Sequence, residues 1–228
     1  GLGDVYKRQD VFGADHIDSY PDVLLALDAL GTPTNHIKVV IHQFVTLKKD
    51  NQIVKMSTRK ANFVTLDELI EKLNSDVIRY FFIMRGVNTH LDFDLDLAMD
   101  ESEKNPVYYL QYAHARIANL LTRFNKEIKS KSKTNLNLLK EDDEIALMKK
   151  LSDFPTKMNQ VHESLEPKQL ATYLEDLAAH YHKFYGNHKV INQDNIDLSL
   201  ARMKLCEATQ IILKIGLSIL GIQAPEKM

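Results

Sequence analysis

The chain has 228 residues, 44% of them hydrophobic, which is enough to bury a core in one large domain or two smaller ones. Its formal net charge of −2 gives no global positive field, so any nucleic-acid binding must come from a local basic face. The single cysteine, Cys206, excludes an intrachain disulfide and a multi-cysteine zinc site, and it fits a reducing cytoplasm. No apolar run is long enough to span a bilayer, so we expect no membrane role.

The first hundred residues alternate strand-like and helix-like segments. Residues 1–9 lack a hydrophobic period, and 4–9 look like the translation of a sequencing adaptor, so we expect a non-native leader there. We then expect a short buried strand that ends at the turn 13–16, a helix over 22–30 and a strand over 37–47. This β-α-β order predicts a parallel sheet. His42 and Gln43 interrupt the second strand, and a satisfied polar pair in the core is favoured over catalysis.

A basic loop, Lys55-Met56-Ser57-Thr58-Arg59, follows a turn at 50–51 and a strand-like run. Its cations flank two small hydroxyl side chains, a composition suited to binding phosphate. A solvated connector explains the same composition, and the local pattern alone favours that reading. The helix after the loop begins with a capping box at Thr65 and Glu68, and Leu66, Leu69, Ile70 and Leu73 are expected on its buried face.

A second apolar helix over 76–85 precedes an acidic segment, Leu91 to Leu97, with apolar and acidic residues in alternation. If this segment is extended, its three aspartates share one face. A metal site is conceivable there, but alternate strand residues lie almost seven ångströms apart (~2 × 3.3 Å). A solvated edge face is therefore favoured.

The chain turns helical from Asn105 onward. The apolar spacing predicts one long helix over 107–128, a flexible polar linker over 129–137, and further helices over 142–165, 167–189 and 197–220. We therefore expect an α/β part over 10–100, followed by an all-α helical bundle over 101–228.

Five stretches, in order, resemble arginyl-tRNA synthetases, which are class I aminoacyl-tRNA synthetases: 55–59, 63–69, 76–82, 105–116 and 220–228. The resemblance implies that 10–100 is the C-terminal part of a class I, Rossmann-like catalytic domain, and that 101–228 is an anticodon-binding domain. It identifies the basic loop as a KMSKS-type signature, with Thr58 in place of the second signature lysine. Arg59 or Lys60 would then have to supply the missing cation.

The resemblance also implies an activity. The parent enzyme would activate L-arginine with ATP, accompanied by Mg²⁺, and transfer it to tRNA(Arg), as a monomer in the cytoplasm. Lys55, Ser57 and Arg59 would stabilise the charge that builds on the phosphoryl oxygens. Met56 and Thr58 in the loop would help to bind ATP. Asp15 and His16 would lie at the arginine and adenosine pocket, although Asp15 alone reads equally well as a helix cap.

The anticodon contacts implied by the resemblance are Tyr109, Tyr112, Arg116, Tyr181, Tyr185 and Met228. Exposed aromatic rings stack on splayed bases, and arginine adds contacts to phosphate or base. The alternative is that the aromatic residues form the core of the bundle, as such stripes usually do.

A His-x-Gly-His-like element, the first half of the nucleotide-binding sheet and the family's N-terminal tRNA-binding domain do not occur in these 228 residues. Because activation needs both signatures around one ATP, we expect the chain alone to be inactive but able to bind tRNA. The alternative is a noncatalytic RNA-binding or helical interaction module of synthetase ancestry.

Overall fold

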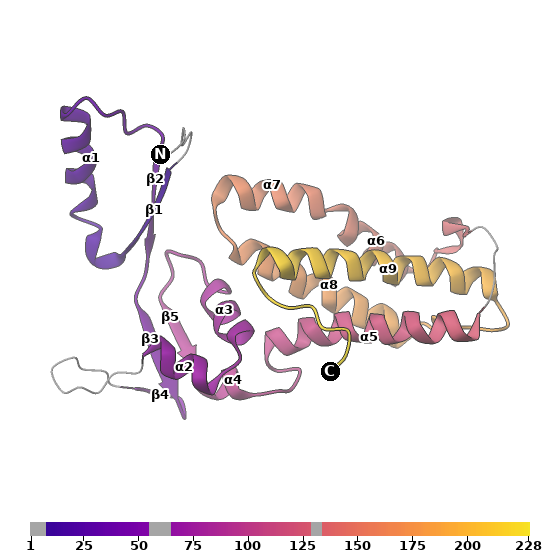
Figure 1. Cartoon of the computed structure of the whole chain (residues 1–228). Helices are drawn as coiled ribbons and strands as arrows, with labels where there is room; N and C mark the ends of the chain where they lie inside the picture. Colours follow the sequence, from indigo (N-terminus) through magenta and orange to yellow (C-terminus); the bar gives the residue numbers. More distant parts are fainter. Residues whose placement is uncertain (1–7, 55–64, 129–133) are drawn as a thin grey trace.

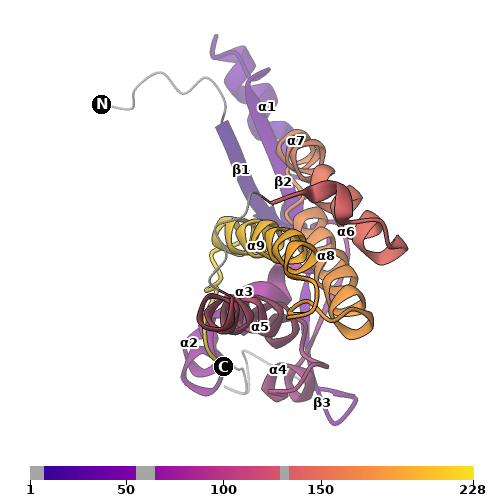
Figure 2. The same ribbon diagram turned by 90° about the vertical axis from the view of Figure 1, so that its right-hand side faces the viewer.

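The computed structural model describes residues 8–54, 65–128 and 134–228. Two small sheets with short helices form the first part of the chain, and long helices lie side by side in the second (Figure 1). The predicted order, α/β and then all-α, is confirmed. Viewed along the bundle, α5, α8 and α9 are seen end on, with α1 and the first sheet beyond one side of them (Figure 2).

The first sheet pairs β1 (Arg8–Gly13) with β2 (Ile37–His42) in parallel, and α1 (Tyr20–Ala29) connects them. This is the predicted β-α-β unit, and β1 begins at Arg8, within the range 1–9 that was expected to be a leader. The expectation that β1 is buried is wrong, because Val11 is 67% exposed. Among the described residues β1 pairs only with β2, and α1 buries none of its side chains against it.

The second sheet has the order β4-β3-β5, formed by β3 (Val45–Lys49), β4 (Gln52–Ile53) and β5 (Leu91–Asp94). Strands β3 and β5 are parallel, and β3 and β4 form a hairpin. Asp50 and Asn51 form the predicted turn with φ of 51° and 57°, the left-handed geometry of a type I′ hairpin. The single strand predicted over 37–47 is in fact two strands in different sheets. The break falls at Gln43, whose N–H donates to the carbonyl of Val87 at 3.0 Å.

Two helices lie beside this sheet, α2 (Leu66–Lys72) and α3 (Ser75–Ile83); α3 packs against β5, and α2 packs against α3. The Thr65 cap is confirmed, since its side chain accepts from the Glu68 N–H at 3.2 Å. Leu69 and Leu73 are buried as expected, but Leu66 and Ile70 are exposed. The buried stripe of this short helix is therefore narrower than its apolar pattern suggested.

The acidic segment does not form one extended row. β5 ends at Asp94, whose Oδ1 accepts from the N–H groups of Asp96 and Leu97, both at 3.0 Å, and so caps α4 (Leu95–Met99). Asp92 pairs with Lys48 at 2.5 Å, and Asp96 accepts from the Asp50 N–H at 2.6 Å. The three carboxylates have separate partners, because the chain changes from strand to helix between them.

The bundle contains α5 (Pro106–Glu127), α6 (Asp142–Ser152), α7 (Phe154–Ser164), α8 (Lys168–Asn187) and α9 (Ile196–Ile219). The helix predicted over 142–165 is divided at Asp153, where Pro155 occupies the first turn of α7. Residues 136–138 of the expected linker form a 3₁₀ turn. Helix α3 joins the two parts of the chain, since its buried Tyr80 donates to Glu175 of α8 at 2.5 Å.

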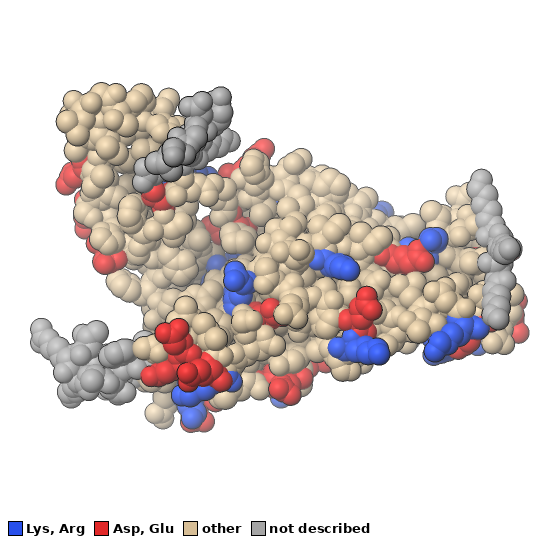
Figure 3. Space-filling model, viewed as in Figure 1, with Lys and Arg blue, Asp and Glu red and all other residues tan. Residues whose placement is uncertain are grey.

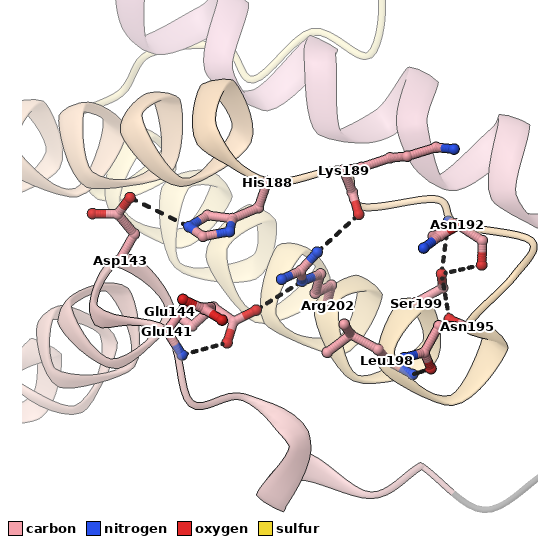
Figure 4. Close-up of polar contacts among 10 residues, drawn as sticks. All are labelled: Glu141, Asp143, Glu144, His188, Lys189, Asn192, Asn195, Leu198, Ser199 and Arg202. Carbon is pink, nitrogen blue, oxygen red and sulfur yellow. Dashed lines mark hydrogen bonds and ion pairs between the residues drawn. The ribbon is translucent and has the colours of Figure 1, made fainter.

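A polar network closes the end of the bundle where α9 begins (Figure 4). Arg202 of α9 donates from Nε to the buried Glu144 of α6 at 2.7 Å and from Nη1 to the carbonyl of Lys189 at 3.0 Å. Ser199 accepts from the Asn192 N–H at 2.8 Å and donates back to the Asn192 carbonyl at 3.0 Å. Because a buried charge is costly without a partner, the ion pair fixes α9 against α6 and the α8–α9 connection.

Candidate nucleic-acid interface

The KMSKS-like residues Lys55, Met56, Ser57, Thr58 and Arg59 lie outside the described residues. Strand β4 ends at Ile53 on one side of them, and α2 begins at Leu66 on the other.

Asp15 and His16 lie on the 3₁₀ turn Ala14–His16, directly after the carboxyl end of β1. Both side chains are exposed, and His16 Nε2 is 3.7 Å from Asp15 Oδ2. The Asp15 carboxylate turns back over Gly13, where a Cβ would lie 2.6 Å from its Oδ1. The next helix, α1, is preceded by Ser19, so Asp15 is not its cap. The pair therefore occupies the edge of a parallel sheet at which α/β proteins bind ligands.

The bundle carries an exposed cluster of aromatic and basic side chains from α5 and α8. Arg116 donates from Nη2 to the Tyr112 hydroxyl at 2.6 Å, and its Cζ lies 4.3 Å from the centre of the Tyr112 ring. The same guanidinium lies 5.1 Å from the ring of Tyr185. Arg116 is thus held between two tyrosines by cation–π contacts and a hydrogen bond. The spacing of Tyr112 and Arg116 on one helix and the position of Tyr185 on another bring the three together.

His182 lies beneath this cluster. Its Nδ1 accepts from Arg116 Nη1 at 3.0 Å, and its ring centre is 4.9 Å from that of the half-buried Tyr109. Burial, and then the charge of Arg116, lower the pKa of His182 to about 4, so the imidazole is neutral near pH 7. Sequence reasoning missed His182, although it adjoins Tyr181 on the same helix as Tyr185. A neutral imidazole can accept from the guanidinium, which orients Arg116 toward the two tyrosine rings.

Tyr181 is fully buried, with its ring centre 5.9 Å from that of Tyr185. Burial raises the pKa of its hydroxyl well above the ordinary value. Tyr181 is therefore a core residue that supports the ring of Tyr185, whereas Tyr112 is 36% exposed. Tyr181 therefore fits the core interpretation of the aromatic stripe, and Tyr112 fits the surface interpretation.

A hollow of about 330 Å³ opens beside the cluster. The hollow is lined by Tyr112, Ala115, Arg116, Asn119, Leu120, Arg123, Tyr185 and Met228. Met228 is 58% exposed at its rim, where the end of the described chain returns to α5 (Figure 1). Asn119 and Arg123 were not predicted, but their helical spacing from Tyr112 and Arg116 continues the same face of α5. The hollow thus combines planar rings, a thioether and guanidinium donors, groups that suit unstacked bases and phosphates.

On the face shown in Figure 3, basic and acidic side chains are interspersed, so that face carries no field of one sign. Recognition of an anion at the hollow would depend on the local guanidinium groups of Arg116 and Arg123. In the described parts of the chain, no group of three or more His, Cys, Asp or Glu side chains could hold a metal ion. Within the same residues, no helix is long and apolar enough to cross a membrane.

Two protein-family models match the chain in succession. The model for tRNA synthetases class I (M) matches residues 13–124, and the model for the DALR anticodon binding domain matches residues 110–228, just over half of the chain. The chain therefore belongs to the DALR anticodon binding domain family. The hollow between α5 and α8 lies within the part that this model matches.

Among curated proteins, the sequence is similar to arginine–tRNA ligases. It is 50% identical over 220 residues to the Salinibacter ruber enzyme, covering 96% of this chain and 39% of that protein. It is 45% identical to the Thermotoga petrophila enzyme, covering 97% of this chain and 41% of that protein. The chain thus spans about two fifths of the length of these relatives. The resemblance to arginyl-tRNA synthetases that the sequence motifs indicated is confirmed.

Solved structures agree with the sequence comparisons. A Campylobacter jejuni protein assigned as an arginyl-tRNA synthetase superposes with a TM-score of 0.86 at 32% identity, over 97% of this chain and 48% of that one. Thermus thermophilus arginyl-tRNA synthetase shares the fold, with a TM-score of 0.79 at 23% identity, over 98% of this chain and 41% of that one.

Proposed function

We propose that this chain supplies the tRNA-binding surface and one half of the ATP-binding clamp of an arginine–tRNA ligase. The parent enzyme would join L-arginine and ATP to form arginyl-adenylate and pyrophosphate, and would then transfer the arginyl group to tRNA(Arg). The observation that carries the proposal is the hollow at Tyr112, Arg116, Tyr185 and Met228, within the segment matched by the DALR model.

The hollow can recognise an anticodon loop by two kinds of contact. Bases splayed out of the loop would stack on Tyr112 and Tyr185, with Met228 filling the gap between them. Arg116, already oriented by His182 and Tyr112, would donate to a base edge or a phosphate without a large loss of side-chain entropy. Tyr109 would contribute from the half-buried layer. Tyr181, expected from the sequence as an RNA contact, is fully buried and would act only by supporting the ring of Tyr185.

We assign the chemistry of activation to the first part of the chain, over 10–100, and anticodon binding to 101–228. Lys55, Ser57 and Arg59 would stabilise the charge on the phosphoryl oxygens of ATP, which Mg²⁺ would accompany, and Met56 and Thr58 would help to bind ATP. Asp15 and His16, at the edge of the first sheet, would contact arginine or adenosine. We further propose that the parent enzyme is a cytoplasmic monomer.

Binding of RNA by the 228-residue chain tests the proposal directly. A tRNA(Arg) transcript is titrated against the chain, beside a transcript in which only the anticodon loop has been replaced. We expect saturable binding of the first and a clear loss of affinity for the second, because the hollow reads unstacked bases. Equal affinity for both would favour the alternative of a noncatalytic RNA-binding module, and no binding of either would overturn the proposal.

A further inference from the structure

Residues 221–228, which we call the tail, follow a defined path from α9 back to α5 (Figure 1). The path begins at Gly221, whose φ of 71° is left-handed. The N–H of Gly221 donates to the Ser218 carbonyl at 3.0 Å, and that of Ile222 to the Leu217 carbonyl at 2.9 Å, which is a Schellman ending. Ile222 is then buried. The helix end thus turns the tail sharply toward α3 and α5.

Three buried side chains hold the tail after this turn. Asp76, in the first turn of α3, accepts at Oδ2 from the Gln223 N–H at 3.2 Å and from Gln111 Nε2 at 3.0 Å. Gln111 of α5 also donates from Nε2 to the Gln223 carbonyl at 3.1 Å. One turn of α5 further on, His114 Nδ1 donates to the Pro225 carbonyl at 2.8 Å. The exposed residue Gln223 is therefore fixed through its backbone.

The consequence is a connection between α3 and the RNA-binding hollow. Gln111 and His114 lie on the face of α5 that holds the tail, and Tyr112 and Arg116 belong to the face that lines the hollow. Met228, five residues after Gln223, lines the hollow at the end of this path. Asp76 orients both Gln111 and Gln223, because its Oδ2 atom accepts a hydrogen bond from each of them.

We propose that Asp76 is a positioning residue for RNA binding, which places Met228 at the hollow through Gln111 and the Gln223 backbone. This rests on the proposed function. Asp76 does not touch the RNA itself, and it acts from a helix outside the segment matched by the DALR model. The register of the tail, and with it the affinity for RNA, is therefore set partly by the catalytic-type part of the chain.

The test measures the dissociation constant of the 228-residue chain for a tRNA(Arg) transcript in a set of variants. Asp76→Ala should weaken binding by about 5- to 10-fold, the scale of one lost contact to a base. Asp76→Asn should restore near-normal binding, because a single amide oxygen can accept both hydrogen bonds. Met228→Ala should weaken binding to a similar degree, and the double variant Asp76→Ala/Met228→Ala should bind no worse than Asp76→Ala alone.

A matched control separates positioning from loss of stability. Ser199→Ala removes hydrogen bonds at the other end of α9, about 30 Å from the tail at ~1.5 Å per residue, and should lower the melting temperature without changing the affinity for RNA. If Asp76→Ala does not fold, Gln111→Met keeps a similar volume, removes the amide that donates to Asp76 and to the Gln223 carbonyl, and carries the same expectation.

The outcomes are distinct. Wild-type affinity in Asp76→Ala, or a double variant whose losses simply add, would overturn the positioning role and leave the proposed function intact. Failure of the wild-type chain to bind tRNA(Arg) would overturn both. A loss of affinity in Ser199→Ala equal to that in Asp76→Ala would assign the effect to stability and would also overturn the positioning role.

Discussion

Tyr112→Ala is expected to weaken binding of tRNA(Arg) while leaving the fold nearly intact. The substitution removes a ring that lines the hollow and is 36% exposed. Stacking of a base on such a ring contributes ~1–3 kcal/mol, so the dissociation constant should rise by roughly 5- to 150-fold. The variant also loses the hydrogen bond from Arg116 at 2.6 Å, which at a partly exposed site costs about 0.5–1.5 kcal/mol of stability.

Two neighbouring substitutions serve as controls. Leu110→Ala, on the buried side of the same helix, should cost about 2–5 kcal/mol of stability without removing a group from the hollow. Tyr112→Phe keeps the ring and removes only the hydroxyl, so most of the affinity should remain. Affinity is measured by titration with a tRNA(Arg) transcript, and stability by urea unfolding. A large loss of stability with normal affinity in Tyr112→Ala would refute the surface assignment and favour the core interpretation.

Three further predictions concern other parts of the chain. In an intact enzyme that carries the basic loop, Lys55→Ala should slow arginine activation by ~10²–10³, and an unchanged single-turnover rate would contradict this role. Gly216→Ala places a Cβ 2.5 Å from Leu174 Cδ2 and should destabilise the bundle by about 1–3 kcal/mol, whereas Gly186→Ala meets nothing within 4 Å and should stabilise α8 by up to ~1 kcal/mol. Urea midpoints that move in the same direction would refute this contrast. His182 has a folded-state pKa of about 4, below its ordinary 6.5, so its contribution to stability is complete above pH 6.5 and is lost as the pH falls toward 4. His182→Phe should therefore lose less melting temperature than wild type between pH 7 and pH 4.5, and equal losses would contradict the assignment.

Local features of the fold follow from short-range chemistry, and these the sequence predicted well. The Thr65 cap, the Asp50–Asn51 turn and the long α5 helix after Asn105 depend on backbone propensities and on hydrogen bonds between near neighbours. Family membership was predictable for a similar reason, because the motifs are contiguous stretches. The break at Asp153 was also readable in principle, since Pro155 lies two residues further on.

Other features depended on which elements pack together. The run 37–47 has the composition of one strand, yet its halves join different sheets because β2 pairs with β1 and β3 with β5. Leu66 and Leu69 look alike in the helical pattern, but only Leu69 faces the core. Periodicity identifies an apolar face, whereas burial depends on the width of the surface that covers it.

At the candidate interface, too, some features follow from the sequence alone and others only from the packing of distant segments. The sequence by itself determined the residue types and their helical spacing, and these, with the family resemblance, were enough to select Tyr112, Arg116, Tyr185 and Met228, which the structure brings together around one hollow. It could not show that Tyr181, one turn from Tyr185, is buried, or that His182 supports Arg116. Nor could it show that the tail is held by Asp76, 147 residues earlier in the chain than Gln223. These are contacts between distant segments, and only the packing of α3, α5, α8 and α9 brings such segments within hydrogen-bonding distance.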